Sequence, residues 1–205
     1  MSTGDVISPI DFRLMEDAQD WTRQAMQKRP WRTEFFEQFA EELSLLSSPE
    51  QRVLELGSGP GFLAEVLLQK LPDITYTLLD FSKAMHQLAK SRLKLFAGRI
   101  EFIERSFKEP DWPQNLGQFQ GIVTNQAVHE LRHKRYALAL HTRAHTCLAP
   151  GGVYLVCDHF VGEGGMTNEQ LYMTIDEQKQ VLLDAGFDKI EQVMLKGGLV
   201  MHKAV

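Results

Sequence analysis

The chain is organised around the stretch Val53-Leu54-Glu55-Leu56-Gly57-Ser58-Gly59-Pro60-Gly61-Phe62-Leu63. An apolar run breaks abruptly into a glycine-rich turn and then resumes with helical spacing, which predicts a strand, a tight loop and a helix. The three glycines allow backbone conformations that other residues avoid, and they leave no side chain between the loop and a ligand. We therefore expect a ligand against this turn. Taken alone, a plain strand-to-helix connection would explain the same turn.

Glu55 narrows the kind of ligand that the turn would hold. It stands at the end of the predicted strand, two residues before the first glycine. Dinucleotide-binding loops read G-x-G-x-x-G and place a pyrophosphate on a helix N-terminus, where a nearby carboxylate would repel it. This loop reads G-x-G-x-G with an acid just upstream. We therefore expect a ligand with a cationic amine, and an NAD(P)-dependent oxidoreductase is the less favoured alternative.

Length and composition restrict the classes of protein to which this chain can belong. The 205 residues fit one domain with a full core, and the net charge of -5 argues against a broad nucleic-acid footprint. A local contact with nucleic acid is still compatible with the basic cluster Arg132-His133-Lys134-Arg135. No apolar run approaches the roughly 18 residues that span a bilayer, and the first residues lack the regions of a signal peptide. We expect a cytoplasmic protein without membrane or nucleic-acid partners.

The first fifty residues are predicted to be helical and amphipathic. A break at Pro30 separates a less regular helix within residues 12–26 from a regular one. The regular helix is indicated by apolar residues at steps of three and four: Phe35, Phe36, Phe39, Leu43 and Leu46. We expect the regular helix to pack on the core. Residues 21–32 either pack in the same way or form a lid over the ligand site.

After Arg52 the pattern alternates between strand and helix. Strands are predicted at 52–56, 74–79, 100–104, 120–124 and 153–158, with helices at 62–71, from Ser82, at 131–148 and at 176–185. Two further strands, 189–195 and 199–203, flank the hairpin signal Lys196-Gly197-Gly198. The sequence therefore predicts an α/β fold. Its doubly wound, mostly parallel sheet has helices on both faces and ends in a C-terminal antiparallel hairpin.

Residues at the carboxyl ends of parallel strands face the ligand site of such a sheet. The first strand ends at Glu55 and the glycine loop. The second ends at Asp80, about twenty residues past the loop, where an acid commonly binds ribose hydroxyls. The remaining ends carry Arg105-Ser106-Phe107, Asn125-Gln126 and Asp158-His159. The two acids and the glycines together predict a ligand with an amine and a ribose.

Four segments in this order resemble the class I S-adenosylmethionine-dependent methyltransferases. They are residues 53–61, 78–82, 121–125 and 148–152, which read VLELGSGPG, LLDFS, GIVTN and LAPGG. The resemblance covers the chain from about residue 52 to its C-terminus. It implies a Rossmann-like methyltransferase domain over residues 51–205, with residues 1–50 as a helical cap of the same domain, and S-adenosyl-L-methionine as cofactor.

The resemblance also implies a cofactor site, residue by residue. Glu55 and the loop residues Gly57, Ser58, Gly59 and Gly61 would contact the methionine end, and Asp80 the ribose hydroxyls. The adenine would lie between Phe81 and Met85, with Ser106 and Phe107 where the family often has an acid; Ser106 departs from that pattern. Asn125 would lie near the sulfonium, and Gln126 belongs to the same site.

Methyl transfer from a sulfonium is an in-line displacement, so positioning supplies much of the acceleration. A general base helps only when the acceptor is a hydroxyl or a protonated amine. The candidates are His129 and His159, each just past the end of a predicted strand. The alternative is that both are structural, hydrogen-bonded histidines. Tyr172 is a weaker candidate for contact with the acceptor.

The segment His129-Glu130-Leu131-Arg132-His133 spells H-E-x-x-H, the helical motif of zinc proteases. That mechanism needs both histidines on one face of a continuous helix. Here the motif straddles the junction between a strand-end loop and a basic helix, so we expect no metal site.

The acceptor is predicted to be a small molecule. Family members that methylate exocyclic amines of bases or glutamine amides commonly carry Asn-Pro-Pro-aromatic after the fourth strand, where this chain has Asn125-Gln126-Ala127-Val128. The competing hypothesis is a protein that binds S-adenosylmethionine or S-adenosylhomocysteine without transfer activity. The acceptor, its nucleophilic atom and the oligomeric state are left open by the sequence.

Overall fold

The computed structural model describes residues 4–46 and 51–205. The helices are α1 (Met15–Lys28), α2 (Arg32–Ser44), α3 (Phe62–Lys70), α4 (Lys83–Arg92), α5 (Ala137–Thr146) and α6 (Ile175–Asp184). Short 3-10 helices are η1 (Lys94–Arg99), η2 (Val128–Leu131) and η3 (Lys134–Tyr136). The strands are β1 (Gln51–Leu56), β2 (Ile74–Asp80), β3 (Ile100–Glu104), β4 (Phe119–Asn125), β5 (Leu148–His159), β6 (Ile190–Lys196) and β7 (Leu199–Ala204).

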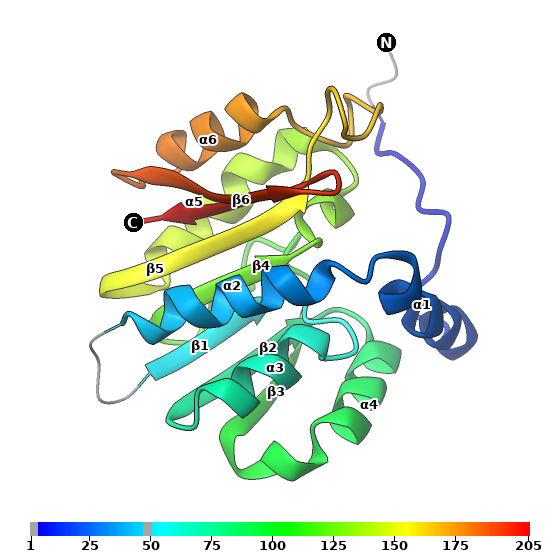
Figure 1. The fold of residues 1–205 in the computed structure, drawn as a ribbon, viewed down its shortest axis with the longest axis vertical. Coiled ribbons are helices and arrows are strands. Elements are labelled where there is room, and N and C mark those ends of the chain that lie inside the picture. The colour runs from blue at the N-terminus through cyan, green and yellow to red at the C-terminus, as the bar shows by residue number, and fades with distance from the viewer. Residues whose placement is uncertain (1–3, 47–50) are drawn as a thin grey trace.

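In the described residues the strands form one seven-stranded sheet in the order β3-β2-β1-β4-β5-β7-β6. The first five strands of this order are parallel, and β7 pairs antiparallel with both β5 and β6 (Figure 1). Lys196 pairs with Leu199 across Gly197 and Gly198, whose φ angles are 57° and 78°. Two left-handed residues make a tight turn that suits the twist of the strands. The predicted sheet and its terminal hairpin are confirmed.

Helices cover both faces of the sheet (Figure 1). Alternate residues of a strand point to opposite faces. In β1, Val53 joins the core cluster shared with α2 and α3, while Leu54 and Leu56 join the cluster shared with α5 and α6. All three side chains are fully buried. This two-sided burial explains why the strand is apolar without interruption.

Helix α2 packs on the sheet as predicted. Phe35, Phe36, Phe39 and Leu43 are buried in the core cluster that also contains Val53. The helix lies so close to β4 that a Cβ atom at Gly121 would stand 2.5 Å from Leu43 Cδ2. The expected boundary between the helical cap and the sheet domain falls at residues 47–50, which lie outside the described residues, so this division stays a prediction.

The long helix predicted over 131–148 is wrong at its start. The chain makes η2 and η3 there, separated by Arg132 in the left-handed conformation with φ 67°, and α5 begins only at Ala137. The helical pattern gave no sign of this break, because Arg132 is held by backbone atoms from the other end of the chain. Strand β5 also begins earlier than predicted, at Leu148, and its pairing with β4 shifts register between Phe119 and Gly121.

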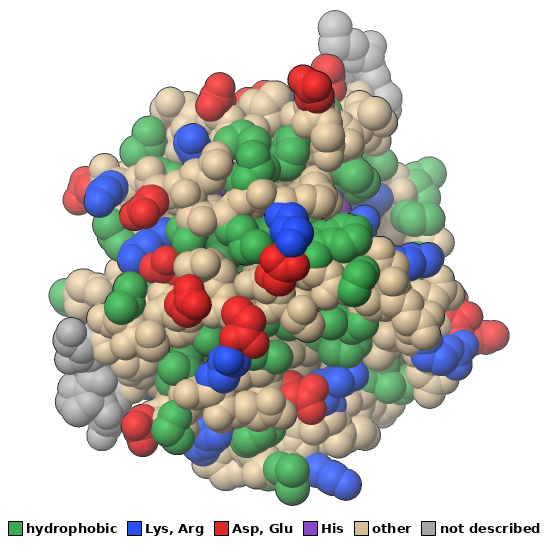
Figure 2. Space-filling view, viewed as in Figure 1, with side chains coloured by type: hydrophobic (Ala, Val, Ile, Leu, Met, Phe, Trp, Pro, Cys, Tyr) green, Lys and Arg blue, Asp and Glu red, His purple; other side chains and the backbone are tan. Residues whose placement is uncertain are grey.

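Among the described helices, none has the length and apolar character needed to cross a membrane. Acidic and basic side chains are interspersed over the face shown in Figure 2.

Candidate active site

The glycine loop joins β1 to α3, and all three of its glycines have positive φ angles. A Cβ at Gly57 would lie 2.4 Å from Ala127 Cβ, so this glycine allows the loop to approach the end of β4. A Cβ at Gly59 would meet no atom within 4 Å. Gly59 therefore leaves open space rather than a packed contact, as expected where a ligand lies against the backbone.

A cleft opens between this loop, the carboxyl ends of the strands, and helices α1 and α2. Its empty volume, counted out to the open mouth and so including solvent space, is ≈ 880 Å³. Of the predicted site residues, the lining contains Glu55, Gly57, Ser58, Gly59, Asp80, Phe81, Met85, Phe107, Asn125, Gln126, His129 and His159. Two others lie elsewhere: Gly61 packs against Ala89 and Leu93 of α4, and Ser106 lines a neighbouring hollow beneath the N-terminal segment.

Glu55 is only 2% exposed, and its Oε2 accepts a hydrogen bond of 2.9 Å from the Tyr76 hydroxyl. Burial raises the pKa of Glu55 well above its usual range; the bond from Tyr76 opposes this rise and the charge of Asp80 adds to it. The sequence led us to expect a charged carboxylate at Glu55. In the site without a ligand, burial instead favours the neutral acid. A cationic amine placed beside Glu55 would favour the charged form.

Asp80 ends β2 and faces the loop. Its Oδ2 accepts from the Gly59 amide and its Oδ1 from the Ser82 amide, both at 2.8 Å. Burial raises the pKa of Asp80 to about 6, against the lowering effect of these backbone bonds. The carboxylate is therefore fixed at the cleft wall, with lone pairs left for hydroxyl donors.

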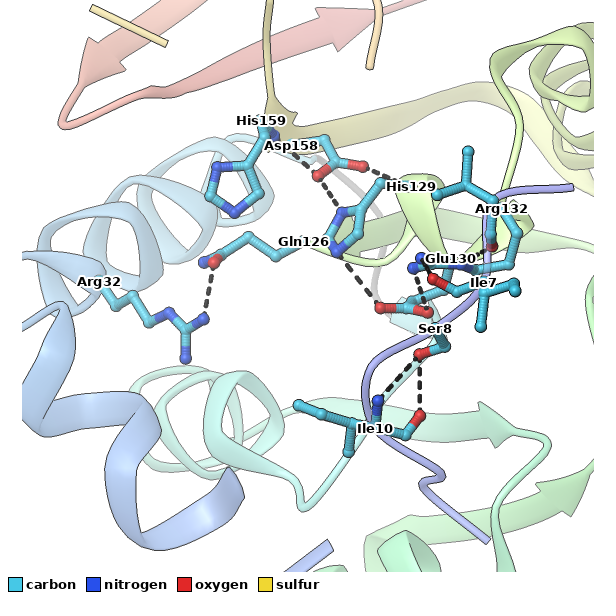
Figure 3. A network of polar contacts seen from close by, with 11 residues as sticks. Ile7, Ser8, Ile10, Arg32, Gln126, His129, Glu130, Arg132, Asp158 and His159 are labelled. Carbon is cyan, nitrogen blue, oxygen red and sulfur yellow. Dashed lines mark hydrogen bonds and ion pairs between the residues drawn. The ribbon is translucent and has the colours of Figure 1, made fainter. Parts of the chain in front are cut away.

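His129 is held between two carboxylates (Figure 3). Its Nδ1 lies 2.7 Å from Asp158 Oδ1, and its Nε2 lies 3.4 Å from Glu130 Oε1. Burial alone would lower the pKa of His129, but the charges and hydrogen bonds of Asp158 and Glu130 outweigh it and raise the pKa to about 10. A protonated imidazole cannot accept a proton, so this arrangement argues against His129 as a general base at neutral pH.

His159 lies beside His129, with 5.4 Å between the ring centroids. Its pKa is lowered to about 4, first by burial and then by repulsion from His129 and Arg29, against the attraction of Asp158. The neutral ring has its Nδ1 3.3 Å from the Gly198 carbonyl oxygen. If Nδ1 carries the hydrogen and donates to that oxygen, Nε2 is an acceptor.

The H-E-x-x-H letters do not form a zinc-protease helix. Helix η2 ends at Leu131, Arg132 is left-handed, and the His133 Nδ1 accepts a bond of 3.1 Å from the Arg135 amide. The two histidines therefore lie on separate turns instead of one helix face. Over residues 4–46 and 51–205, no group of three or more His, Cys, Asp or Glu side chains is arranged to hold a metal.

Within the stretch 21–32, the cleft is lined by Trp21, Arg29 and Arg32, which were not among the predicted site residues. Arg32 Nη2 donates to Gln126 Oε1 at 2.7 Å, and its guanidinium lies 5.4 Å from the Trp21 ring centroid. The sequence indicated this stretch only as a possible lid. Asp158, which fixes His129, was predicted only as a residue at the end of the fifth strand, and no role was assigned to it.

Residues 4–14 run as a strap past the site, from the end of η2 towards the start of α4 (Figure 1, Figure 3). Val6 N donates to Arg132 O at 2.8 Å, and the Arg132 side chain donates to Val6 O and Ile7 O, each at 2.9 Å. At the other end the Ser82 hydroxyl donates to Phe12 O. Phe12 also lines the cleft and packs edge-on against Trp21.

Residues 53–152 match the model of a family described as a methyltransferase domain. The carboxy-S-adenosyl-L-methionine synthase of Nautilia profundicola is 27% identical over 136 residues, which cover 65% of this chain and 56% of that protein. A protein-L-isoaspartate O-methyltransferase of Shewanella denitrificans is 31% identical over 115 residues, 55% of this chain and 47% of that protein. The chain spans about half the length of these curated relatives.

Solved structures show the same fold. An O-methyltransferase family protein from Burkholderia thailandensis superposes with a TM-score of 0.73 at 18% identity, covering 94% of this chain and 60% of that one. Human N-acetylserotonin methyltransferase, solved in complex with SAM, superposes with a TM-score of 0.73 at 18% identity, covering 94% of this chain and 56% of that one. In both cases the likeness extends over nearly the whole chain.

Proposed function

We propose that this chain, whose residues 53–152 match the model of a methyltransferase domain, is a class I S-adenosylmethionine-dependent methyltransferase that transfers the methyl group of S-adenosyl-L-methionine to a small-molecule acceptor. The observation that carries the proposal is the open face of Gly59. This glycine borders the cleft, and its amide donates a hydrogen bond to the carboxylate of Asp80. A backbone without a side chain and a fixed acid beside it suit a nucleoside with an amino-acid tail.

Unpartnered polar atoms in the cleft support the cofactor assignment. Ser58 Oγ and Asn125 Oδ1 are buried and have no hydrogen-bond partner among the described residues. Both line the cleft, Ser58 in the loop that follows β1 and Asn125 at the end of the neighbouring strand β4. Buried polar groups in folded proteins are normally satisfied, so such atoms at a cleft wall indicate a ligand. We assign the ammonium group of the cofactor to Glu55 and Asn125, and its ribose to Asp80.

The bound cofactor would supply an electrophilic methyl group on a sulfonium, with a neutral thioether as leaving group. The chain's part is to hold the acceptor in line and to exclude water. Aromatic side chains from helices α1, α2 and α3 and from three connecting segments line the cleft: Phe12, Trp21, Phe36, Phe62, Phe81 and Phe107. His159, with Nε2 as acceptor, can orient a hydroxyl or amine donor, while His129 acts as a fixed cation beside it.

The experiment is a transfer assay on the full 205-residue chain. The protein is incubated with S-adenosylmethionine and separate pools of carboxylic acids, phenols, amines and thiols, and S-adenosylhomocysteine is quantified by mass spectrometry. At least one pool is expected to yield it together with a product heavier by one CH2 unit. Cofactor binding without product from any pool would favour the binding protein without transfer activity. The cytoplasmic location and the absence of nucleic-acid and membrane partners stay predictions from the sequence.

A further inference from the structure

Among the described residues, Arg32 is a buried cation without a carboxylate counter-ion. Its side chain belongs to a residue that is 5% exposed, and its Nε has no hydrogen-bond partner in the described part of the chain. Burial, and then repulsion from Arg29, lower the pKa of Arg32 to about 10, so the group remains charged at neutral pH. A buried charge is costly unless an opposite charge or a set of acceptors meets it. Here the protein supplies one amide oxygen.

Gln126 gives that oxygen and presents a second donor. Because a guanidinium only donates, the Gln126 atom 2.7 Å from Arg32 Nη2 must be the carbonyl oxygen, which fixes the orientation of the amide. Its Nε2 is then a donor, and it is buried without an acceptor among the described residues. The backbone of Gln126 is left-handed, with φ 55°, and its backbone N–H donates a hydrogen bond of 2.7 Å to the carbonyl oxygen of Cys157. Both features hold Gln126 in this place.

Two sets of polar groups in the cleft differ in kind. Acids and an unpartnered acceptor lie at the ends of β1, β2 and β4, at Glu55, Asp80 and Asn125. Two cations, Arg29 after α1 and Arg32 in α2, line the cleft together with the unpartnered donor of Gln126, which follows β4. Figure 3 shows Arg32 reaching Gln126 from α2, on the side of Gln126 opposite Glu130. Two adjacent donor groups, one of them charged, match the two oxygens of a planar carboxylate.

We propose that Arg32 and Gln126 form a binding site for a carboxylate group of the methyl acceptor. This inference rests on the proposed function and adds the class of acceptor, a small carboxylic acid. The cofactor carries a single carboxylate against two positive charges, its sulfonium and its ammonium. The bound cofactor therefore adds positive charge to a cleft that already holds Arg29 and Arg32, whereas a carboxylate on the acceptor would offset one of these two charges.

The neighbouring histidines agree with an acceptor that is already an anion. His129 is held protonated between Asp158 and Glu130, and His159 is a weak base. An acceptor that needed a proton removed at neutral pH would find no suitable group in either ring. A carboxylate arrives without that proton.

The first arm of the test measures cofactor affinity. Calorimetric titration with S-adenosylhomocysteine is done on the wild-type chain, on Arg32→Gln, and on Arg23→Gln as a matched control on the exposed side of α1. The site is assigned to the acceptor, so the affinity of Arg32→Gln is expected to stay within about twofold of wild type. A loss of about tenfold or more in Arg32→Gln alone would show that Arg32 binds the cofactor's own carboxylate, and would overturn the proposal.

The second arm measures anion preference. Acetate, benzoate and phenylacetate are titrated into the protein saturated with S-adenosylhomocysteine, and each is compared with its uncharged amide. Wild type and Arg23→Gln are expected to bind at least one carboxylate about tenfold or more tighter than the amide, and Arg32→Gln to lose this preference. No preference in wild type, or a preference for phenyl phosphate over benzoate, would contradict the proposal.

A second variant covers the case in which Arg32→Gln does not fold. Gln126→Glu places a carboxylate against Arg32 within the chain, so it is expected to fold and to lose the preference for added carboxylates. Retained preference in Gln126→Glu would contradict the site. If the wild-type chain does not bind S-adenosylhomocysteine, the proposed function fails. The carboxylates and their amides are then titrated into the protein alone, and this comparison still decides whether Arg32 binds anions.

Discussion

Asp158 Oδ1 lies 2.7 Å from His129 Nδ1, and the same carboxylate accepts the backbone amides of both His129 and His159. One buried side chain at the end of β5 therefore fixes two histidines that come from different strand ends. Burial would raise the pKa of Asp158, but the charge of His129 and the hydrogen bond to it outweigh this and hold the pKa below its ordinary value. The pair is an internal ion pair at the floor of the site.

Replacing Asp158 by Asn removes the counter-ion of His129. Breaking a buried pair by changing one partner leaves an uncompensated charge, so we expect a loss of about 3 to 5 kcal/mol in the free energy of unfolding at neutral pH. Urea denaturation measures it. Nuclear magnetic resonance titration of His129 should show a pKa near 10 in wild type and a much lower one in Asp158→Asn. Titration of wild-type His129 near pH 6.5 would contradict the ion pair.

The contribution of this pair to stability has a defined pH window. The pKa of His129 is raised from 6.5 to about 10, so its stabilisation is fully present below pH 6.5 and is lost as pH rises through about 10. The pKa of Asp158 is lowered from 3.8, so its stabilisation is present above pH 3.8 and is lost as pH falls through the folded value. The difference in the free energy of unfolding between wild type and Asp158→Asn should therefore be largest between pH 3.8 and pH 6.5. A difference that does not change with pH would contradict the ion pair.

Asp80 should make cofactor binding depend on pH. Its pKa of about 6 means that acid conditions protonate it, and a protonated carboxyl is a poorer acceptor for ribose hydroxyls. Affinity for S-adenosylhomocysteine is expected to fall as pH drops through about 6, by at most about tenfold per pH unit. At neutral pH, Asp80→Ala should weaken binding by about 1 to 3 kcal/mol. Calorimetry across this range is the measurement, and an unchanged affinity in Asp80→Ala would refute the ribose role.

Gly57 and Gly59 form a matched pair of loop positions. Alanine at Gly57 would collide with Ala127 Cβ, so Gly57→Ala should destabilise the fold by about 1 to 3 kcal/mol. Alanine at Gly59 meets no protein atom within 4 Å, so Gly59→Ala carries mainly the backbone strain of about 1 to 2 kcal/mol. Its methyl group would stand where the cofactor lies, and the affinity should drop by about tenfold or more. Normal S-adenosylhomocysteine binding by folded Gly59→Ala would contradict the assignment of this loop.

The strap over residues 4–14 should loosen when Arg132 is replaced by Ala. The Arg132 side chain donates to Val6 O and Ile7 O, and these bonds disappear in Arg132→Ala. Hydrogen exchange followed by mass spectrometry is expected to show faster exchange in the strap, while β1 and β4 stay protected. Arg143→Ala, on the exposed side of α5, is the control and should exchange like wild type. Equal protection of the strap in both variants would show that Arg132 does not hold it.

The parts of the fold that follow local rules could be predicted from the sequence. Gly57 to Gly61 carry the signal of a strand, loop and helix, and Gly197 with Gly198 carries that of a hairpin, because only glycine adopts these turns readily. Glu55 and Asp80 could be placed in one site because parallel strands bring their carboxyl ends to one edge. Each of these inferences needs only a pattern within a few residues or the order of the strands.

The parts that depend on distant contacts could not be predicted. Arg32 meets Gln126 across 94 positions of sequence, and nothing near Arg32 marks it as a cleft residue. The left-handed backbone of Arg132 depends on a partner segment more than a hundred residues away, so the helical pattern around it was misleading. The charge state of His129 likewise follows from Asp158, 29 positions later, and reverses the role that its position alone suggested.

The central claim is that the cleft beside Gly59 holds S-adenosylmethionine, and calorimetric titration of the full chain with S-adenosylhomocysteine tests it most directly, with NADH titrated in parallel. We expect saturable binding of S-adenosylhomocysteine at one site per chain, much tighter than that of NADH, and its loss in Gly59→Ala. Binding of NADH in preference to S-adenosylhomocysteine, or no binding of S-adenosylhomocysteine by the folded wild-type chain, would contradict the account.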